Sequence, residues 1–291
     1  MSSLAPTPDR IAQDLDHART RGPLQQIVVP PCPEMLARLQ AALARPEPDL
    51  GEVARIAGSD VAMGATLIRH ACGAQFAAFA PAQTLGQAMT RLGLAQTARV
   101  MTSFLVRQGL PADNRHLQNF WSHSTRRAIA LDGLARQLPG LSPDLAYTYG
   151  LFSHVGMPVL LSSFRSYGST IVEGHARRDR SFVQTENANH RTDHAVVGAL
   201  VARVWRLAPA VMCAIRLHHD LDALGSEHID PEVQTLIAAG LVAEHLARRH
   251  AGLDPEADWT VYAEAALAWL HAGPDDLSQW EDALTPLLDV E

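Results

Sequence analysis

Apolar residues recur at helical spacing along most of the chain. The longest regular stretch extends from residue 121 to residue 138, where small and apolar residues follow a spacing of three and four over about five turns. These residues are Trp121, Ser124, Ala128, Leu131, Ala135 and Leu138. We find no convincing segment in which apolar and polar residues alternate, as they do in a half-buried strand. The pattern therefore predicts an all-α protein.

Prolines and glycines divide this helical pattern into segments. They are frequent among the polar residues of segment 1–26, so we expect a loosely ordered, flexible leader with one short helical turn. A second cluster of helix breakers, at residues 109–114, separates two helical lobes, which we place at 27–108 and 109–252. Residues 253–291 carry three tryptophans, and we expect them to form a C-terminal helical extension packed on the domain.

The composition narrows the class of protein. With 291 residues, of which 47% are apolar, the chain can bury a large core. No run of about 18 apolar residues occurs, and no secretory signal is present, so we expect no membrane contact and a cytoplasmic location. Three widely spaced cysteines exclude a disulfide framework. The net charge of −7 argues against direct nucleic-acid binding, which requires an excess of cations.

The candidate chemistry lies in the histidines. His154 and Val155 stand in segment 151–158, at the end of a helix that Ser142 and Pro143 are predicted to begin. Four further histidines, on other predicted helices, are spaced so that a helical bundle could bring them to the same point. They are His123, His194, His218 and His219. Imidazole binds divalent transition metals, so the five histidines are candidate ligands of a metal site.

Two observations argue against a working hydrolytic site. A pair of cations normally shares a bridging carboxylate, and Val155 cannot supply one. His218 and His219 would project about 100° apart on a helix, so they could serve two ions, or one ion and a phosphate, but not one ion together. Of the other carboxylates, we expect Asp220 to solvate a helix end and Glu244 to act as a ligand only if it turns inward.

A polar segment with clustered arginines is a second candidate site. Residues 173–191 lack a clear helical period, and we expect them to form a connecting loop over the surface. Basic side chains here and at one other place could hold phosphate or nucleotide, although such clusters are more often a solvated face. They are Arg177, Arg178 and Arg180 in the loop, and the pair Arg126 and Arg127. A nucleotide bound at the loop without hydrolysis is one hypothesis for function.

A series of different short motifs follows the order of the two lobes. Those of the N-terminal lobe are Pro30-Pro31-Cys32-Pro33, Ser59-Asp60-Val61 and the stretch from Thr84 to Gly93. Those of the C-terminal lobe are Phe120-Trp121-x-His123-Ser124, Gly150-Leu151-Phe152-Ser153-His154-Val155-Gly156, Glu186 with His194-Ala195-x-Val197-Gly198-Ala199, Trp205-x-Leu207-x-Pro209 and His218-His219. From about residue 25 to residue 252 this order resembles the HDOD domain, a family related to the HD-type metal-dependent phosphohydrolases. The chain departs from the family's motifs at Cys72-Gly73, where Asn-Ser is frequent, and carries Val155 in place of the Asp of the His-Asp pair.

The resemblance implies a two-lobed, all-helical bacterial signalling module over residues 27–252, with an HD-like C-terminal lobe, that works through protein contacts. On this hypothesis the partners are separate signalling proteins, the protein is not an enzyme, and no cofactor is expected. The five histidines are then structural or the remains of a metal site. The alternative is a metal-dependent phosphohydrolase or cyclic-nucleotide phosphodiesterase using a divalent ion such as Fe, Mn, Ni or Zn. Its ligands would be His123, His154, His194 and His219.

Overall fold

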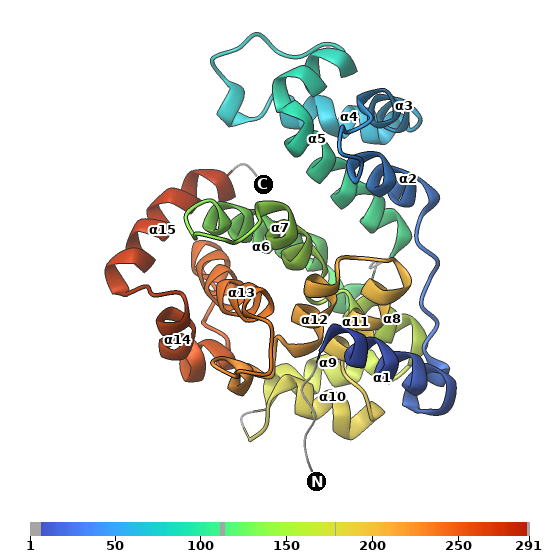
Figure 1. Cartoon of the computed structure of the whole chain (residues 1–291), viewed down its shortest axis with the longest axis vertical. Helices are drawn as coiled ribbons and strands as arrows, with labels where there is room; N and C mark the ends of the chain where they lie inside the picture. Colours follow the sequence, from blue (N-terminus) through green and yellow to red (C-terminus); the bar gives the residue numbers. More distant parts are fainter. Residues whose placement is uncertain (1–6, 111–113, 178, 290–291) are drawn as a thin grey trace. The chain divides into compact units, whose positions relative to one another are not determined.

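The fold is all-α, as the spacing of apolar residues predicts. The computed structural model describes residues 7–110, 114–177 and 179–289, and these contain no strand (Figure 1). The α-helices are α1 (Pro8–Arg21), α2 (Glu34–Leu43), α3 (Leu50–Gly58), α4 (Val61–Ala71), α5 (Leu85–Gly109), α6 (Phe120–Ala135), α7 (Pro143–Phe152), α8 (Gly156–Ser163), α9 (Tyr167–Ala176), α10 (Phe182–His190), α11 (His194–Val204), α12 (Pro209–Leu217), α13 (Pro231–His250), α14 (Ala257–Trp269) and α15 (Pro274–Leu288). Short 3-10 turns are η1 (Pro23–Gln26), η2 (Ala74–Phe76), η3 (Arg115–Leu117) and η4 (Leu221–Ala223).

The helices form two compact units. The smaller unit extends from Pro30 to Leu110, and the larger unit combines the segment up to Val29 with the described residues from Asn114 onward. The chain therefore leaves the larger unit just before a proline-rich segment and returns to it at the cluster of helix breakers. No helix in the described parts of either unit combines the length and apolar composition needed to cross a bilayer.

The smaller unit contains α2 to α5, and its helix starts follow the capping residues visible in the sequence. Asp49, Asp60 and Thr84 each accept hydrogen bonds from backbone N–H groups in the first turn of the following helix. Gly93 interrupts α5 with a φ of 72°, a value that costs glycine little. Helix α5 therefore consists of two helical segments joined by a break at Gly93.

The N-terminal segment of the larger unit is more ordered than its composition indicates. Thr7 caps α1 and Pro8 occupies its first turn, so the prolines begin a helix of 14 residues instead of preventing one. Ile11 and Leu15 are buried, and α1 packs on α11 and α12. For residues 8–21 the expectation of a flexible leader with one short turn is therefore wrong, and residues 1–6 lie outside the described part.

The segment expected to be a surface loop also contains helical structure. Residues 173–191 include the end of α9 and the whole of α10, so the expectation of a continuous loop is wrong. Ser181 and Gln184 form a capping box that starts α10, a signal readable in the sequence. The helix matters for the site because it carries Glu186 into the core.

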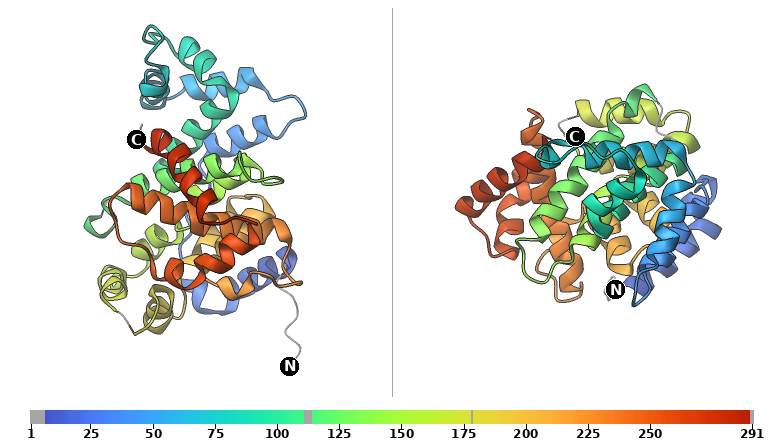
Figure 2. Two further views of the ribbon diagram at one scale, coloured as in Figure 1. Left: turned by 90° about the vertical axis from the view of Figure 1, so that its left-hand side faces the viewer. Right: turned by 90° about the horizontal axis from the view of Figure 1, so that it is seen from above.

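The core of the larger unit is centred on α6, which packs against α7, α13 and α15 (Figures 1 and 2). Helices α6 and α7 approach closely because residue 150 is glycine: a Cβ there would lie 2.7 Å from the Cα of Ala128. The C-terminal helix α15 buries Trp280, Leu284 and Leu288.

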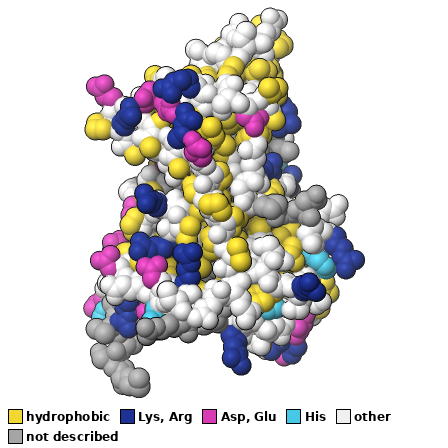
Figure 3. Space-filling model, turned by 90° about the vertical axis from the view of Figure 1, so that its right-hand side faces the viewer, with side chains coloured by type: hydrophobic (Ala, Val, Ile, Leu, Met, Phe, Trp, Pro, Cys, Tyr) yellow, Lys and Arg dark blue, Asp and Glu magenta, His cyan; other side chains and the backbone are white. Residues whose placement is uncertain are grey.

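On the face shown in Figure 3, arginines and acidic side chains are intermingled, and no wide patch of one sign is visible.

Candidate metal centre

Four of the five candidate histidines converge in the larger unit. His154 lies between α7 and α8, His194 begins α11, and His218 and His219 follow the end of α12. One ring nitrogen from each lies within 4.8 Å of those of the other three, and the group contains no carboxylate oxygen. The rings of His218 and His219 are 4.0 Å apart between centroids. The structure therefore assembles a set of imidazole donors from distant parts of the sequence.

A close approach of two backbones brings His154 next to His194. A Cβ on Gly156 would overlap the carbonyl oxygen of His194 and lie 2.7 Å from the backbone nitrogen of Gly198. Only glycine permits this contact between the start of α8 and the first turn of α11. Asp193 caps the same turn by accepting from Val196 N at 2.9 Å, which fixes the position of His194.

His194 is held by a buried carboxylate. Its Nδ1 donates to Oε2 of Glu186 at 2.7 Å, and its backbone N–H donates to the same oxygen at 3.3 Å. The Tyr167 hydroxyl donates to the other oxygen of Glu186. All three side chains are buried. A carboxylate on Nδ1 leaves Nε2 as the nitrogen that faces the cluster, the arrangement found behind many metal-binding histidines.

His218 and His219 both face the cluster, so the expectation that adjacent positions would diverge is wrong. Helix α12 ends at Leu217, and the two histidines lie in the turn that follows. His218 Nδ1 donates to the carbonyl oxygen of Ile215 at 2.7 Å, and its Nε2 is buried without a hydrogen-bond partner among the described residues. His219 Nδ1 donates to Oδ2 of Asp258 at 2.6 Å. Both rings thus direct Nε2 towards the cluster.

The protonation of the cluster is set by its surroundings. Burial lowers the pKa of His154 and of His218 well below the usual value, and neighbouring positive charges add to this effect. Burial is the largest effect and acts to lower the pKa of His194, but the charge and hydrogen bond of Glu186 together with the charges of Asp193 and Glu256 outweigh it, and the pKa is raised. His194 Nε2 and His219 Nε2 are 3.0 Å apart, so one proton lies between them. A metal ion would take the place of that proton.

His154 differs from the other three because its neighbour is a cation. Nη2 of Arg127 lies 3.4 Å from His154 Nδ1, and Nη1 donates to Ser153 Oγ at 2.9 Å. Arg127 also forms an ion pair with Glu244, whose side chain turns inward from α13. Val155 is fully buried in the apolar core and supplies no polar atom.

His123 does not join the group. It lies in the first turn of α6, one turn before Arg127, and it is Arg127 that reaches the cluster. Burial lowers the pKa of His123, an effect that Glu244 opposes and the nearby arginines reinforce. The prediction that all five histidines meet at one point is therefore wrong for His123. Asp220 is exposed immediately before η4, and its side chain makes no capping hydrogen bond to that helix.

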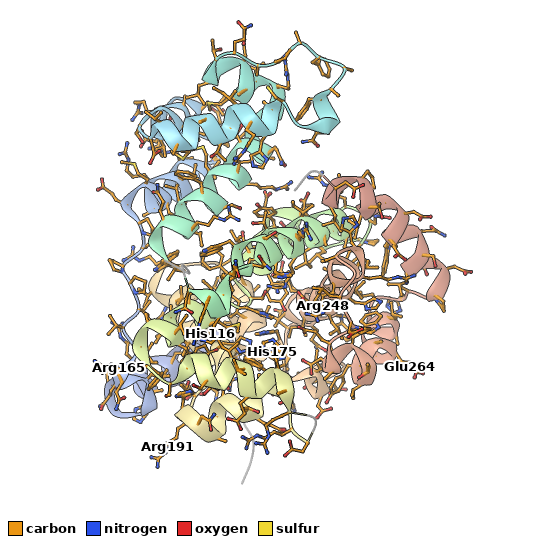
Figure 4. All side chains as sticks on the ribbon, turned by 180° about the vertical axis from the view of Figure 1, so that it is seen from behind. His116, Arg165, His175, Arg191, Arg248 and Glu264 are labelled. Atoms are coloured by element: carbon orange, nitrogen blue, oxygen red, sulfur yellow. The ribbon has the colours of Figure 1, made fainter. Side chains whose placement is uncertain are left out.

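The sequence patterns do not identify several residues that surround the site. Asp258 and Glu256 lie at the start of α14, and no motif identifies either of them as part of the site. Arg127 is expected only as a phosphate ligand or a solvated residue, yet it is buried. Arg248 of α13, labelled in Figure 4, lies 3.3 Å from Glu256 and 4.0 Å from Glu244. Each of the carboxylates Glu186, Glu244, Glu256 and Asp258 thus has a hydrogen-bonded or charged partner.

The cluster opens on a small cavity. Its volume is about 30 Å³, and its lining includes Arg127, His154, His218, His219, Glu244, Glu256 and Asp258. This volume accommodates an ion with one or two waters. It is far below the several hundred Å³ typical of sites that enclose a nucleotide-sized ligand.

The donor set fits a single transition-metal ion. The nitrogens of His194 and His219, 3.0 Å apart, lie close to the spacing of about 3.3 Å expected for two ligands of one tetrahedral ion. The four ring nitrogens as a group lie within 4.8 Å of one another, so the rings would have to close in on the ion. Three rings have Nδ1 bonded to an acceptor, and the unpartnered, buried Nε2 of His218 would gain a partner. A second ion would require a bridging carboxylate, and none belongs to the group of four.

Arg177 and Arg180, the described arginines of the second candidate site, offer little free positive charge. Arg177 forms hydrogen-bonded ion pairs with Glu173 and Asp179, and Arg180 with Glu173. A phosphate would have to displace these acids. Arg178 lies outside the described residues.

Comparison with solved structures places this fold. An HDOD domain protein of unknown function from Geobacter sulfurreducens has a TM-score of 0.72 at 18% identity and covers 96% of this chain and 98% of its own. A candidate phosphohydrolase from Shewanella amazonensis SB2B has a TM-score of 0.71 at 19% identity, covering 95% and 93%. A candidate signal transduction protein from Marinobacter aquaeolei VT8 has a TM-score of 0.67 at 18% identity, covering 97% and 68%.

Sequence comparison gives the family. An uncharacterised protein of Treponema pallidum (strain Nichols) is 24% identical over 220 residues, which cover 75% of this chain and 42% of that protein. This chain therefore spans less than half the length of that relative. The profile of the HDOD domain matches residues 29–221, which include all five candidate histidines and make up more than half of the chain. The chain belongs to the HDOD domain family.

Proposed function

We propose that the protein is a regulatory module of bacterial signal transduction that acts through contacts with separate signalling proteins. We propose further that its histidine cluster holds one divalent transition-metal ion without hydrolysing a substrate. The observation that carries the proposal is the contrast between four converging imidazoles and neighbouring carboxylates that already have a hydrogen-bonded or charged partner. It favours a divalent metal ion over a cluster that holds no cofactor.

The surroundings of the cluster support a non-hydrolytic role. A hydrolytic metal site needs an open position for water and a base or bridging acid beside it. Val155 is apolar, Glu244 is paired with Arg127, and Asp258 is bonded to His219. The cavity of about 30 Å³ encloses room for an ion and its waters, so a substrate would have to lie outside it, at its solvent-exposed side. A bound ion would instead join the α7–α8 turn, α11 and the end of α12.

The proposed signalling role draws on the family and on one structural neighbour. The neighbour from Marinobacter aquaeolei VT8 is named as a candidate signal transduction protein. The neighbour from Shewanella amazonensis SB2B is named as a candidate phosphohydrolase, which supports the rival function. A further observation favours this rival: the Nδ1 atoms of three histidines are already bonded to acceptors, as in working metal sites.

Metal analysis combined with an activity assay separates the two functions. The protein is purified without added metal, then saturated in turn with Mn, Fe, Co, Ni and Zn, dialysed and subjected to elemental analysis. We expect about one ion per chain, as for a single site of imidazole ligands. His218→Ala should lose the ion, whereas His228→Ala, an exposed histidine outside the cluster, should retain it.

Turnover of a generic phosphodiester is measured on the same metal-loaded samples. We expect none above the rate of the His218→Ala variant. Turnover that disappears in His154→Ala would establish the phosphohydrolase and contradict the regulatory function. Absence of metal in the wild-type protein under all five conditions would contradict the metal proposal and leave the cluster as a hydrogen-bonded element of the core.

A further inference from the structure

Arg127 and Glu244 form a buried ion pair at the edge of the histidine cluster. They join α6 to α13, and their side chains are only 6% and 13% exposed. Both residues line the same cavity as the histidines. A free carboxylate lining this cavity would be a candidate ligand for a metal ion, but that of Glu244 is neutralised by the guanidinium of Arg127.

The remaining N–H groups of Arg127 contact His154 and the residues that precede it at the end of α7. Nη1 is bonded to Ser153 Oγ at 2.9 Å and approaches the carbonyl oxygen of Gly150 at 3.4 Å. Nη2 approaches Nδ1 of His154 at 3.4 Å. A guanidinium has only donors, so His154 accepts through Nδ1 and carries its proton on Nε2. In this tautomer Nε2 has no lone pair for a metal ion.

The charge of Arg127 has a second effect on the cluster. The cation lies beside His154 and at the wall of the cavity in which an ion would be held. The guanidinium at the cavity wall and a metal ion inside the cavity would repel each other, and the low dielectric of a buried site strengthens the repulsion. Arg127 therefore opposes metal binding in three ways: by its charge, by occupying Glu244, and by fixing the unsuitable tautomer of His154.

We propose that Arg127 is a built-in competitor of the metal ion that limits the strength of binding at His194, His218 and His219. This inference rests on the metal binding proposed above. It assigns to Arg127 the role of setting affinity, a role that neither the HDOD motifs nor the histidine pattern indicates.

The test is zinc affinity, measured by competition with a chromophoric chelator, in the wild type, Arg127→Gln, Arg127→Met and the double variant Arg127→Met/Glu244→Gln. The glutamine side chain removes the positive charge but retains hydrogen-bond donors for Glu244 and Ser153. The methionine side chain removes the charge and the donors. We expect both single variants to bind zinc at least about tenfold more tightly, the scale on which residues behind a metal ligand act. The double variant should lose part of that gain, because its position 244 no longer carries a free carboxylate.

Circular dichroism establishes which variants are folded, and Arg127→Gln decides the outcome if Arg127→Met is unfolded. Equal or weaker zinc binding in Arg127→Gln, with the wild type binding one ion, would overturn the role of Arg127 and leave the proposed function intact. If Arg127→Gln binds zinc and the wild type does not, the proposed role of Arg127 as a competitor is supported, and metal binding by the native protein is overturned. No binding in either would overturn both.

Discussion

Nδ1 of His194 lies 2.7 Å from Oε2 of Glu186, and both side chains are buried in the larger unit. The carboxylate comes from α10 and the imidazole from the start of α11, so the bond fixes the ring across the turn between the two helices. Because Tyr167 donates to the other carboxylate oxygen, Glu186 cannot rotate freely. This bond determines which nitrogen of His194 faces the cluster.

Substitution of Glu186 by Gln should therefore weaken metal binding without removing a ligand. The amide oxygen of the new side chain can still accept from Nδ1, but the charge that makes the imidazole a stronger donor to the metal is gone. We expect zinc affinity to fall by about tenfold or more, measured by chelator competition. Glu173→Gln, which changes an acid of the surface ion pairs on α9, is the control and should bind zinc like the wild type. Equal affinity in both variants would show that Glu186 has no influence on the site.

The contact between Gly156 and His194 predicts a large difference between two glycine substitutions. In Gly156→Ala the new Cβ meets backbone atoms of α11 that cannot move aside, so we expect a loss of about 3 kcal/mol in the free energy of unfolding. In Gly86→Ala on α5 the Cβ meets no atom within 4 Å, and we expect a change between zero and a gain of about 1 kcal/mol. Urea unfolding measures both, and a Gly156→Ala protein as stable as the wild type would contradict the packing described here.

The cluster also predicts the response of the metal-free protein to acid. Burial lowers the pKa of His154 and His218 below that of the unfolded chain, so their contribution to stability is full above about pH 6.5 and is lost as the pH falls towards the folded pKa. His194, with a raised pKa, contributes in the opposite sense: its stabilisation is present below about pH 6.5 and lost as the pH rises through its folded pKa. On acidification His154 and His218 lose their contribution to stability and only His194 gains one, so acidification should destabilise the fold.

This is measured by urea unfolding in a chelator at pH 7.5 and pH 5.5. Each proton contributes at most about 1.4 kcal/mol per pH unit. His218→Gln should lose less stability between the two pH values than the wild type, and His228→Gln as much as the wild type. If acid destabilises His218→Gln and the wild type equally, burial of His218 does not contribute to the pH dependence.

Val155 allows a direct test of the missing carboxylate. Val155→Asp places a charge in the core, and without metal we expect a loss of about 3 kcal/mol or more in the free energy of unfolding. Zinc should restore part of this loss, because the new carboxylate lies next to His154. Val155→Asn, similar in shape but uncharged, is the control, and zinc should raise its melting temperature no more than that of the wild type. Equal zinc responses of the two variants would show that position 155 does not face the ion.

The helical fold and much of the site could be predicted from the sequence. Helical spacing and capping residues such as Thr84 predict the helices, and the spacing of His154, His194, His218 and His219 predicts their approach. Three features could not be predicted in this way. The direction of His218 and His219 depends on where α12 ends, which periodicity places only approximately.

The other two concern residues that act on the histidines. Asp258 meets His219 across 39 positions of sequence, and no local pattern indicates such a pair. Arg127 lies in a helix beside another arginine, as solvated pairs do, and its burial is decided by Glu244 on a distant helix. Ser181 and Gln184, by contrast, form a capping box that predicts α10, and with it the element that carries Glu186.

We propose that the imidazoles of this cluster hold one ion and that no carboxylate bridges it to another. X-ray absorption spectroscopy of the zinc-loaded protein tests it most directly. We predict three or four nitrogen ligands at about 2.0–2.1 Å with the multiple scattering of imidazole. This pattern should be lost in His218→Ala, and no metal–metal distance should be present. A metal–metal vector of about 3.5–4 Å, the signature of a two-metal hydrolytic site, would contradict the account.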